Sequence, residues 1–512
     1  MLNNKLIGLV SGLSLFFIIL LIPVPDNVRP DAMHVLAVAL LMATWWITEA
    51  IPIPATALLP IFLFPMLGVM NGSEVTQPYA HHLIYLFLGG FLIAVTIEKW
   101  NLHRRIALYT IRFVGITPNR IILGFMIASA GLSMWISNTA ATMMMLTIGI
   151  AVLKQVIDEI HSDPDIQVDT SPEHFHFGIA LMLGIAYAAS IGGIATLIGT
   201  PPNAILAGLI ETQFGQSISF LNWMMFALPL SIIMLIITWY YITHIAYPSE
   251  IDHLPGGKET IQRELTELGP MSTEEKSVLF IFCSVAILWM VRGLVDTEQF
   301  KTVKDSTIAM GGALLLFIIP SNLKKHEFLL DWQTAIKIPW DILILFGGGF
   351  ALAKGFNDSG LTQTIADQLI ILQGSNLFLI IAIVTILVIF LTEITSNTAT
   401  ASMILPIIAA LAVAMHIHPY SLMIAVALAA SFAFMLPVAT PPNAIVFSSR
   451  YVTIQQMAKT GIWVNLVGAI IITLFIMFFL PFVWDIDIKT LPTDMDIIDT
   501  VNTEEITSKV KN

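Results

Sequence analysis

The stretch "SNTATASMILP" (396–406) lies inside an apolar run that begins near Leu377 and continues to Met415. Ser, Asn and Thr stand side by side in it, at a depth where a bilayer offers no water to their polar groups. Nearly the same letters occur once earlier, as "SNTAATMMMLT" (137–147), again inside an apolar run. Because both copies have the same surroundings, we expect both to serve one purpose.

The composition indicates a membrane protein with many spans. Hydrophobic residues make up 56% of the 512 residues, charged residues only 11%, and the mean hydropathy is +0.84. A soluble domain carries about 25% charged residues. Apolar runs of about 20 residues recur along the chain, which predicts an all-α polytopic membrane protein. The single cysteine, Cys283, excludes an internal disulfide and a cysteine metal cluster.

Two apolar runs, 120–153 and 375–414, are too long for one crossing, and each has an SNT motif near its middle. We expect each run to fold back at the motif and form a re-entrant hairpin. The first run, 6–24, has no cleavage site of a signal peptide, and we interpret it as a first transmembrane helix. Without the hairpins, 11 transmembrane helices remain, and an odd number places the termini on opposite sides.

The distribution of Lys and Arg predicts the orientation. With the N-terminus in the cytoplasm, most of the 23 Lys and Arg residues fall in cytoplasmic segments, as the positive-inside rule requires. The exception is the loop with Arg292, Lys301 and Lys304, which this topology places outside. The sequence therefore predicts a multi-pass protein of the cell membrane with a cytoplasmic N-terminus and an external C-terminus.

Three sequence blocks recur in the same order, which indicates an internal repeat. "FLGGFLIA" (87–94) matches "FGGGFALA" (346–353), the SNT motifs match each other, and "GTPPNAIL" (199–206) matches "ATPPNAIV" (439–446). The predicted spans give the two copies opposite orientations, a pattern of secondary transporters. The expected division is a first helix at 1–30, a first inverted repeat at 31–250 with a hairpin at 119–156 and a broken helix at 177–212, a cytoplasmic connector at 251–275, a second inverted repeat at 276–484 with a hairpin at 374–414 and a broken helix at 420–448, and a polar tail at 485–512.

Each SNT motif offers neutral oxygen ligands at a hairpin tip. Such a tip must be buried in protein or line an aqueous cavity, because lipid cannot satisfy its backbone groups. Ser133 and Thr392 each lie four residues before the serine of a motif and share its helix face. Hydroxyl and amide oxygens without paired carboxylates suit a monovalent cation better than Ca²⁺ or Mg²⁺. For a single copy, a packing or capping motif is the alternative.

The two TPPN motifs predict helix breaks. Their prolines cannot donate backbone hydrogen bonds and end the preceding helix, which frees the carbonyls of Gly199 and Ala439 for a cation. The helix that restarts after each break points its N–H groups and its dipole toward an anion. A simple kink is the alternative for one copy, and the pairing of all four motifs in an inverted repeat favours the functional interpretation.

The segment "ASFAFMLPVATPPNAIV" (430–446) resembles the signature of the divalent anion–sodium symporter family, the sodium-coupled dicarboxylate transporters. The SNT motifs and the earlier GTPPN support this resemblance, which covers nearly the whole chain up to about residue 485. It implies an elevator-type transporter, active as a homodimer in the bilayer. Its co-transported ion would be Na⁺, its substrates would be C4-dicarboxylates such as succinate, malate and fumarate, and it would need no organic cofactor or nucleic acid.

Carried over motif by motif, the resemblance implies two sodium sites with a dicarboxylate between them. The first sodium ion would be held by Ser133, Ser137, Asn138 and Gly199, and the second by Thr392, Thr395, Asn397 and Ala439. The substrate would contact residues of the same motifs: Ser137, Asn138, Thr139, Thr200, Ser396, Asn397, Thr398 and Thr440.

Other interpretations stay open at this point. A carrier of this fold could exchange dicarboxylates without sodium, or carry citrate, sulfate or another oxyanion, because fold does not fix the substrate. The chain lacks GxSxG, HExxH and Walker motifs, which argues against an enzyme. Glu393 is interpreted equally as part of a structural ion pair or as a modulator of the second sodium site. His82 and Asp341, at the heads of two spans, are expected to be solvated or to cap helices.

Overall fold

The computed structural model describes residues 2–495, except 27, 116, 163–167, 252–256 and 295–301. Within this part of the chain the secondary structure is helical, apart from one hairpin of two short strands. The prediction of an all-α fold is thereby confirmed, with the small hairpin as an unpredicted addition. Of the predicted polar tail at 485–512, residues 496–512 lie outside the described residues.

The N-terminal part of the chain forms helices that lead up to the first SNT motif. Pro30 occupies the first turn of one of them, where its missing N–H costs nothing, and Asn71 and Glu74 form a capping box at another. The elements are α1 (Leu2–Leu21), α2 (Pro30–Thr48), α3 (Ile53–Thr56), α4 (Leu59–Met66), α5 (Gly72–Thr76), the 3₁₀ turn η1 (Gln77–Ala80), α6 (His82–Lys99) and α7 (Leu102–Val114).

The first copy of the motifs lies in a helical hairpin and a broken helix. The hairpin turns at 134–137, and the next helix is interrupted at 194–200, directly before Pro201. Gly192 lets this helix lie close to the hairpin, because a Cβ atom there would come within 2.3 Å of the carbonyl oxygen of Ala130. The elements are α8 (Pro118–Ser133), α9 (Asn138–Ser162), α10 (His176–Gly193), α11 (Pro201–Phe214), α12 (Phe220–Tyr240) and the π-helical segment η2 (Tyr241–Ala246).

The middle of the chain contains a helix in the predicted connector segment, and the strand hairpin. The strands pair in antiparallel fashion between two helices of the repeat. The elements are α13 (Gly257–Leu268), α14 (Thr273–Leu294), α16 (Asp305–Ile318), β1 (Pro320–Asn322), η3 (Leu323–Lys325), β2 (Glu327–Phe328), α17 (Trp332–Ala335), α18 (Trp340–Asp358), α19 (Leu361–Leu369) and η4 (Ile370–Leu372).

The second copy of the motifs repeats the arrangement of the first. Its hairpin turns at 393–396, and its broken helix is interrupted at 430–440, directly before Pro441. The elements are α20 (Leu377–Thr392), α21 (Asn397–Ala414), α22 (Pro419–Ala429), α23 (Pro441–Ser448), α24 (Ile454–Leu474), the π-helical segment η5 (Phe475–Phe479), α25 (Leu480–Trp484) and η6 (Thr493–Met495). All four breaks therefore lie at the SNT and TPPN motifs.

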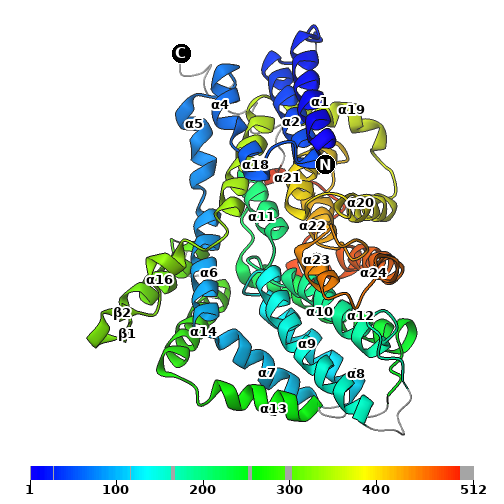
Figure 1. Cartoon of the computed structure of the whole chain (residues 1–512). Helices are drawn as coiled ribbons and strands as arrows, with labels where there is room; N and C mark the ends of the chain where they lie inside the picture. Colours follow the sequence, from blue (N-terminus) through cyan, green and yellow to red (C-terminus); the bar gives the residue numbers. More distant parts are fainter. Residues whose placement is uncertain are drawn as a thin grey trace.

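The helices that carry the motifs meet in the interior of the molecule. In Figure 1, α6, α14 and α16 lie on one side and α20, α22 and α24 on the other, with α11, α18 and α21 between them. Buried apolar side chains of both repeats form one large core, and a smaller core joins α1, α2 and α18. Almost every residue of α10 and α22 is buried, which indicates that the broken helices lie at the centre of the protein.

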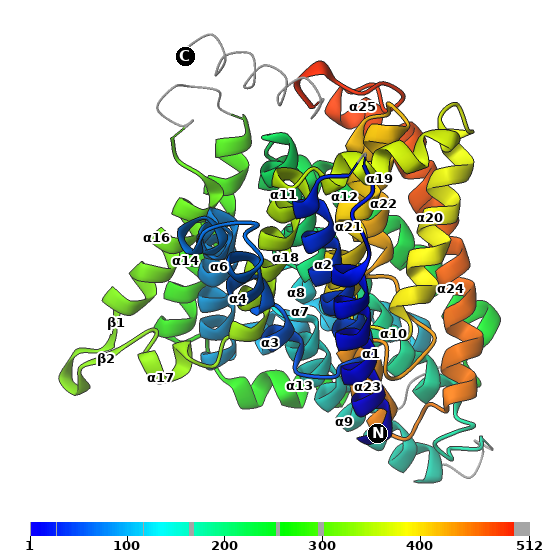
Figure 2. The same cartoon turned by 90° about the horizontal axis from the view of Figure 1, so that it is seen from above.

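Two ion pairs join α14 to neighbouring helices, one to α7 and one to α16. Figure 2 shows the beginning of α1 and the connector helix α13 near one edge and α25 near the other. Around α7, the buried Arg105 pairs with Glu275 at 2.8 Å. Near the start of α16, the Arg292 guanidinium lies 2.9 Å from the carboxylate of Asp305. This ion pair neutralises a cation of the loop that departs from the positive-inside pattern.

Eight helical stretches in the described part of the chain are long and apolar enough to cross a membrane, judged by length and composition. Two of them, Asn138–Ser162 and Asn397–Ala414, are arms of the hairpins. By contrast, α16 has 14 residues and is about 21 Å long at 1.5 Å per residue. The number of 11 crossings with two re-entrant hairpins stays a prediction.

Candidate ion and substrate site

The first SNT motif lies where one helix of the hairpin ends and the next begins. The last residue of α8, Ser133, donates its hydroxyl proton to the Oδ1 atom of Asn138, the first residue of α9. The hydroxyl of Ser137 accepts the backbone N–H of Ala140 at 3.2 Å and so caps α9. The hairpin tip thus holds the amide oxygen of Asn138 in place. Ser137, Asn138 and Thr139 are half-buried, so that they stay accessible to a ligand.

The first break lies directly against this tip. A Cβ atom at Gly193 would be 2.8 Å from Oδ1 of Asn138 and 3.2 Å from the carbonyl oxygen of Gly199. Gly199 is just as confined, since a Cβ atom there would lie 2.3 Å from the carbonyl oxygen of Gly193. The structure therefore brings together three of the four residues predicted for the first sodium ion: Ser133, Asn138 and Gly199.

A buried asparagine braces the loop of the first break. The Nδ2 group of Asn203 donates to the carbonyl oxygens of Thr196 at 2.7 Å and Ile194 at 3.2 Å. The hydroxyl of Thr196 in turn donates to the carbonyl oxygen of Met134 in the hairpin tip, at 2.6 Å. These bonds supply partners for backbone carbonyls that the broken helix leaves unpaired.

The second SNT motif has the same construction. The hydroxyl of Thr392, the last residue of α20, lies 2.8 Å from Oδ1 of Asn397 and 3.0 Å from the carbonyl oxygen of Ala430. Ser396, Asn397 and Thr398 are half-buried, like their counterparts. The hydroxyl of Thr395 is engaged elsewhere, 2.6 Å from the hydroxyl of Thr400.

The second break is braced by an asparagine at the corresponding position of its TPPN motif. Asn443 donates from Nδ2 to the carbonyl oxygens of Ala433 and Leu436, each at 3.0 Å. Ala439 is buried and its N–H donates to the carbonyl of Leu436 at 3.2 Å. Of the residues predicted for the second sodium ion, Thr392 and Asn397 are joined by a hydrogen bond, whereas the bonds of Thr395 and Ala439 are to other residues.

The asparagines of the two TPPN motifs were not among the predicted site residues. Both are fully buried, and the Oδ1 atom of each has no hydrogen-bond partner among the described residues. Their position as the last letter of a repeated motif was the signal in the sequence. Their role as braces could not be derived from the sequence, because they donate to backbone carbonyls, which every residue has.

Glu393 is a buried carboxylate that holds the second break. Its Oε1 atom accepts the backbone N–H groups of Phe434 at 2.8 Å and Met435 at 2.9 Å, and Oε2 accepts that of Leu436 at 3.1 Å. Asn465 of α24 donates its amide to Oε1 at 2.7 Å. Of the two interpretations of Glu393, the structural ion pair is not found among the described residues, where backbone amides and a neutral side chain balance the carboxylate. The role as a modulator of the second sodium site stays a prediction. A carboxylate that accepts several N–H groups is well solvated without a cation.

The two repeats touch at their breaks. The hydroxyl groups of Thr200 and Ser431 lie 3.4 Å apart, and both are buried. Tyr187, on the broken helix of the first repeat, donates its hydroxyl proton to the carbonyl of Phe434 in the break of the second, at 2.7 Å. Thr440 begins α23 and accepts the N–H of Asn443 at 3.3 Å. The breaks of the two repeats are therefore in direct contact, and the second break also binds the carboxylate of Glu393.

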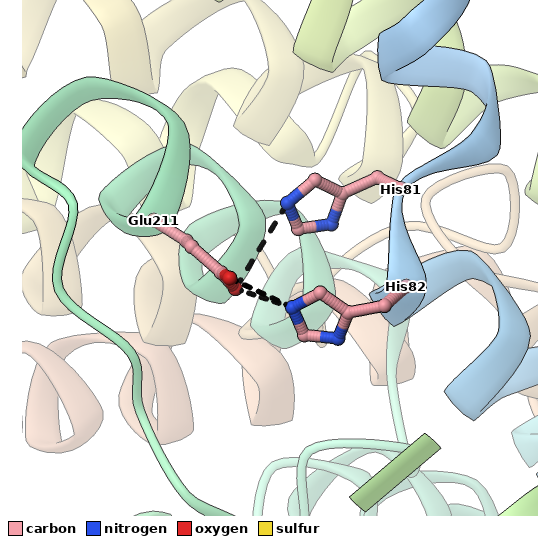
Figure 3. A group of neighbouring side chains, drawn as sticks. All are labelled: His81, His82 and Glu211. Carbon is pink, nitrogen blue, oxygen red and sulfur yellow. Dashed lines mark hydrogen bonds and ion pairs between the residues drawn. The ribbon is translucent and has the colours of Figure 1, made fainter. Parts of the chain in front are cut away.

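A second polar cluster lies away from the motifs and was not predicted. His82 was expected to be solvated or to act as a cap, but its Nε2 atom lies 2.7 Å from a carboxylate oxygen of Glu211, as Figure 3 shows. The neighbouring His81 takes the capping role instead, since its Nδ1 accepts the N–H of Leu83 at 3.4 Å. Asp341 is exposed at the start of α18, as expected.

Sequence comparisons place the chain among known transporters. The family described as "Sodium:sulfate symporter transmembrane region" matches residues 3–485. The sodium-dependent dicarboxylate transporter SdcS of Staphylococcus saprophyticus is 48% identical over 489 residues, which are 95% of this chain and 93% of that protein. SdcS of Staphylococcus aureus, strain bovine RF122, is also 48% identical, with the same coverage.

Solved structures with little sequence similarity share the fold. The YdaH transporter of Alcanivorax borkumensis superimposes with a TM-score of 0.54 at 12% identity, over 82% of this chain and 89% of that one. MtrF of Neisseria gonorrhoeae, from a class of antimetabolite efflux pumps, gives a TM-score of 0.52 at 11% identity, over 78% and 83% of the two chains. These two show the architecture alone.

The family match covers almost the whole chain, and its near relatives are transporters rather than enzymes, as the absence of enzyme motifs predicted. The motifs that carried the resemblance lie at the four breaks of the structure. The chain therefore belongs to the sodium:sulfate symporter family, the divalent anion–sodium symporters that its sequence resembles.

Proposed function

We propose that this protein is a sodium-coupled secondary transporter of C4-dicarboxylates such as succinate, malate and fumarate. The observation that carries the proposal is the pair of SNT tips, each tied by its asparagine to a hydroxyl one helical turn away, at a contact between two helix breaks. The similarity to the sodium-dependent dicarboxylate transporters SdcS supports the choice of ion and substrate.

The charge of the region supports coupling to sodium. The predicted substrate contacts are neutral, and the nearby Glu393 adds a negative charge. A dianion in a partly dehydrated site is costly unless its charge is compensated. The N-termini of α11 and α23 supply about half an elementary charge each, which falls short of a dianion. At least one bound cation is therefore needed, and two bring the bound set close to neutrality.

The residue roles follow the two tips. We assign the first sodium ion to Ser133, Ser137, Asn138 and Gly199, whose tip and break are in contact. We assign the second to Thr392, Thr395, Asn397 and Ala439. Because the hydroxyl of Thr395 is engaged with Thr400, this residue would contribute its backbone carbonyl. The substrate lies between the two tips. It contacts Thr139 and Thr398 of the tips and Thr200 and Thr440 of the TPPN motifs.

The transport cycle is proposed to be an elevator movement in a homodimer. The hairpins and broken helices would move as one body, since hydrogen bonds join them across the repeats. The remaining helices, α6, α14 and α16 among them, would stay fixed. With 11 crossings and a cytoplasmic N-terminus, Ser162 faces the cytoplasm and Ser217 the outside.

The orientation is testable with single cysteines, because both of these serines are exposed. We would replace Cys283 by serine and then introduce Ser162→Cys or Ser217→Cys. A membrane-impermeant thiol reagent added outside intact cells should label position 217 alone. Labelling of position 162 under the same conditions would reverse the orientation.

The transport experiment uses purified protein in proteoliposomes. Uptake of labelled succinate should require external sodium and fail with potassium or choline, and it should not require internal dicarboxylate. Binding of sodium and of succinate should strengthen each other, as linkage demands. Uptake should fall as the pH drops through the second pKa of succinate, because the site is built for the dianion. Equal succinate affinity in sodium and in choline would favour the exchanger instead.

Sulfate is the second candidate substrate, because the matching family is named for it. Labelled sulfate uptake, and competition between sulfate and succinate in the same vesicles, separates the two. The dicarboxylate proposal predicts that excess unlabelled succinate abolishes succinate uptake and that equal sulfate leaves it unchanged.

A further inference from the structure

His81, His82 and Glu211 converge from two helices at a place that the transport site does not use. Figure 3 shows the two imidazole rings side by side, with the carboxylate of Glu211 opposite their edges. The rings stack with centroids 4.7 Å apart. The Nε2 atom of His82 lies 2.7 Å from Oε2 of Glu211 and that of His81 lies 3.9 Å from the same oxygen. One ligand atom of each residue lies within 4.8 Å of the others.

Two imidazoles and one carboxylate are a ligand set for zinc. Zn²⁺ binds histidine nitrogen and carboxylate oxygen at about 2.0–2.2 Å, and three protein ligands with one water are a common set. The side chains are 18%, 27% and 19% exposed for His81, His82 and Glu211, so that an ion can enter from solvent. The adjoining pocket, which His82 and Glu211 help to line, has a volume of about 40 Å³. That volume accommodates a few waters or an ion.

We propose that His81, His82 and Glu211 form a binding site for a zinc-type divalent cation, which joins α6 to α11. The two ligands on the α6 side and the one on α11 belong to helices that are separate in the sequence, so the ion would link them directly. Both carboxylate oxygens of Glu211 contact Nε2 of His82, Oε1 at 2.8 Å and Oε2 at 2.7 Å. Lys304 lies 2.9 Å from Oε1, so Oε2 is the oxygen available to an ion between the imidazoles.

The surroundings predict a site of modest affinity. Zinc ligands usually have a partner for the second imidazole nitrogen, and loss of such partners costs about 10–100-fold in affinity. Here Nδ1 of His82 is buried and has no hydrogen-bond partner among the described residues. Nδ1 of His81 would have to give up the long bond from Leu83. The ammonium group of Lys304 repels a divalent ion as well.

An ion bound at this cluster would affect transport. This inference rests on the proposed elevator movement. In that proposal α11 moves and α6 does not. An ion that holds both would favour the conformation in which His82 and Glu211 are in contact, and it would slow exchange with the other conformation. External zinc should therefore inhibit uptake without competing with succinate.

The site is tested first by binding, which does not depend on transport. Zinc chloride is titrated into the purified full-length protein by calorimetry, in sodium buffer without dicarboxylate. We expect one saturable site that His82→Ala and Glu211→Gln each weaken by about tenfold or more, whereas the control His161→Ala, an exposed histidine elsewhere, has no effect. Lys304→Gln should tighten binding by about tenfold, because it removes a like charge.

Several results would overturn the proposal. The absence of a saturable site, or a site that survives both His82→Ala and Glu211→Gln, would rule out zinc at this cluster. Unchanged or weaker zinc binding in Lys304→Gln would show that the ion is not at Glu211. A circular dichroism spectrum and an elution volume equal to those of the unmodified protein establish that each variant is folded.

The transport arm follows in proteoliposomes. External zinc should inhibit succinate uptake by the unmodified protein, while His82→Ala keeps its basal uptake and needs about tenfold more zinc or more for the same inhibition. Zinc that binds as expected but leaves uptake unchanged would refute the link between α6 and α11. If the protein transports no succinate at all, the proposed function fails, and the zinc titration still decides the site.

Discussion

The two motif-bearing halves share one frame but hold their breaks with different chemistry. In the first half, the hydroxyl of Thr196 joins the break to the carbonyl of Met134. In the second half, the residue at the position of Met134 is Glu393, whose carboxylate gathers three backbone N–H groups of the break. The difference shows that both halves break the chain at the same places, while the second half adds a buried charge beside its proposed cation site.

The flanking helices differ in the same way. Ser231 and Asn465 each lie eleven residues after the first residue of α12 and α24. Ser231 donates to the carbonyl of Ile191 at 2.8 Å, whereas Asn465 donates to Glu393 at 2.7 Å. In the first half the neutral serine donates a hydrogen bond to a backbone carbonyl. In the second half the amide of the asparagine donates to a carboxylate.

The largest expected effect tests what the halves share. Asn138→Ala and Asn397→Ala should each reduce succinate uptake at low substrate by at least about 100-fold, since each removes two interactions with charged ligands of about 1.5–3 kcal/mol. Uptake in proteoliposomes, at matched protein amounts, measures this. Asn322→Ala, in the strand hairpin, serves as the control. Loss of uptake in only one of the two variants would break the functional equivalence of the tips.

The next effect tests the tighter break of the first half. In Gly199→Ala the new methyl group would lie 2.3 Å from the carbonyl oxygen of Gly193, so the backbone must move, at a cost of about 1–3 kcal/mol. The reverse change in the second half, Ala439→Gly, should cost about 0.5–1 kcal/mol. Thermal unfolding of both purified variants gives the comparison. Equal destabilisation would mean that the two breaks are equally confined.

A smaller effect concerns the charge of Glu393. Glu393→Gln keeps the size of the side chain but removes the negative charge, and it should weaken the apparent sodium affinity of uptake by about tenfold, or about 1.4 kcal/mol. The matched change in the first half, Met134→Leu, should leave sodium affinity unchanged. The sodium dependence of uptake at fixed succinate measures both. An unaltered sodium curve for Glu393→Gln would reduce this carboxylate to a purely structural brace.

The last comparison concerns the stability of two variants in the flanking helices. Asn465→Ala removes a hydrogen bond to a buried charged group and should cost about 1.5–3 kcal/mol, whereas Ser231→Ala removes a neutral bond and should cost about 1 kcal/mol. The unfolding midpoints in detergent, compared at one protein concentration, sharpen the contrast. A larger loss for Ser231→Ala would invert our assignment of the stronger brace.

The helix breaks could be predicted because proline, and polar residues within long apolar runs, leave a direct mark in the sequence. The hairpin predicted at 374–414 corresponds to α20 and α21, and the broken helix predicted at 177–212 to α10 and α11. The connector expected at 251–275 contains α13. Helical spacing predicted that Ser133 lies near the first SNT motif. Its bond to Asn138 was not predicted, because it crosses the turn between α8 and α9.

The remaining contacts could not be predicted, because they join distant segments or involve the backbone. Glu393 and Asn465 are 72 residues apart, and the N–H groups at 434–436 have no signature in the sequence. The contact between His82 and Glu211 spans 129 residues. Helices α12 and α24 have 21 residues each, and each is followed by a π-helical segment. The two segments form at equivalent places, although their sequences differ.

The short helix α16 has a consequence for the surrounding lipid. Its 14 residues reach about 21 Å, less than the hydrocarbon thickness of about 30 Å, and Leu314, Leu315 and Ile318 are exposed along it. An apolar helix shorter than the bilayer makes the adjacent leaflets thin locally, at a fraction of a kcal/mol per Å of mismatch. The acyl-chain length of the lipid would therefore affect the rate of transport. Reconstitution in phosphatidylcholines of increasing chain length should give progressively slower uptake.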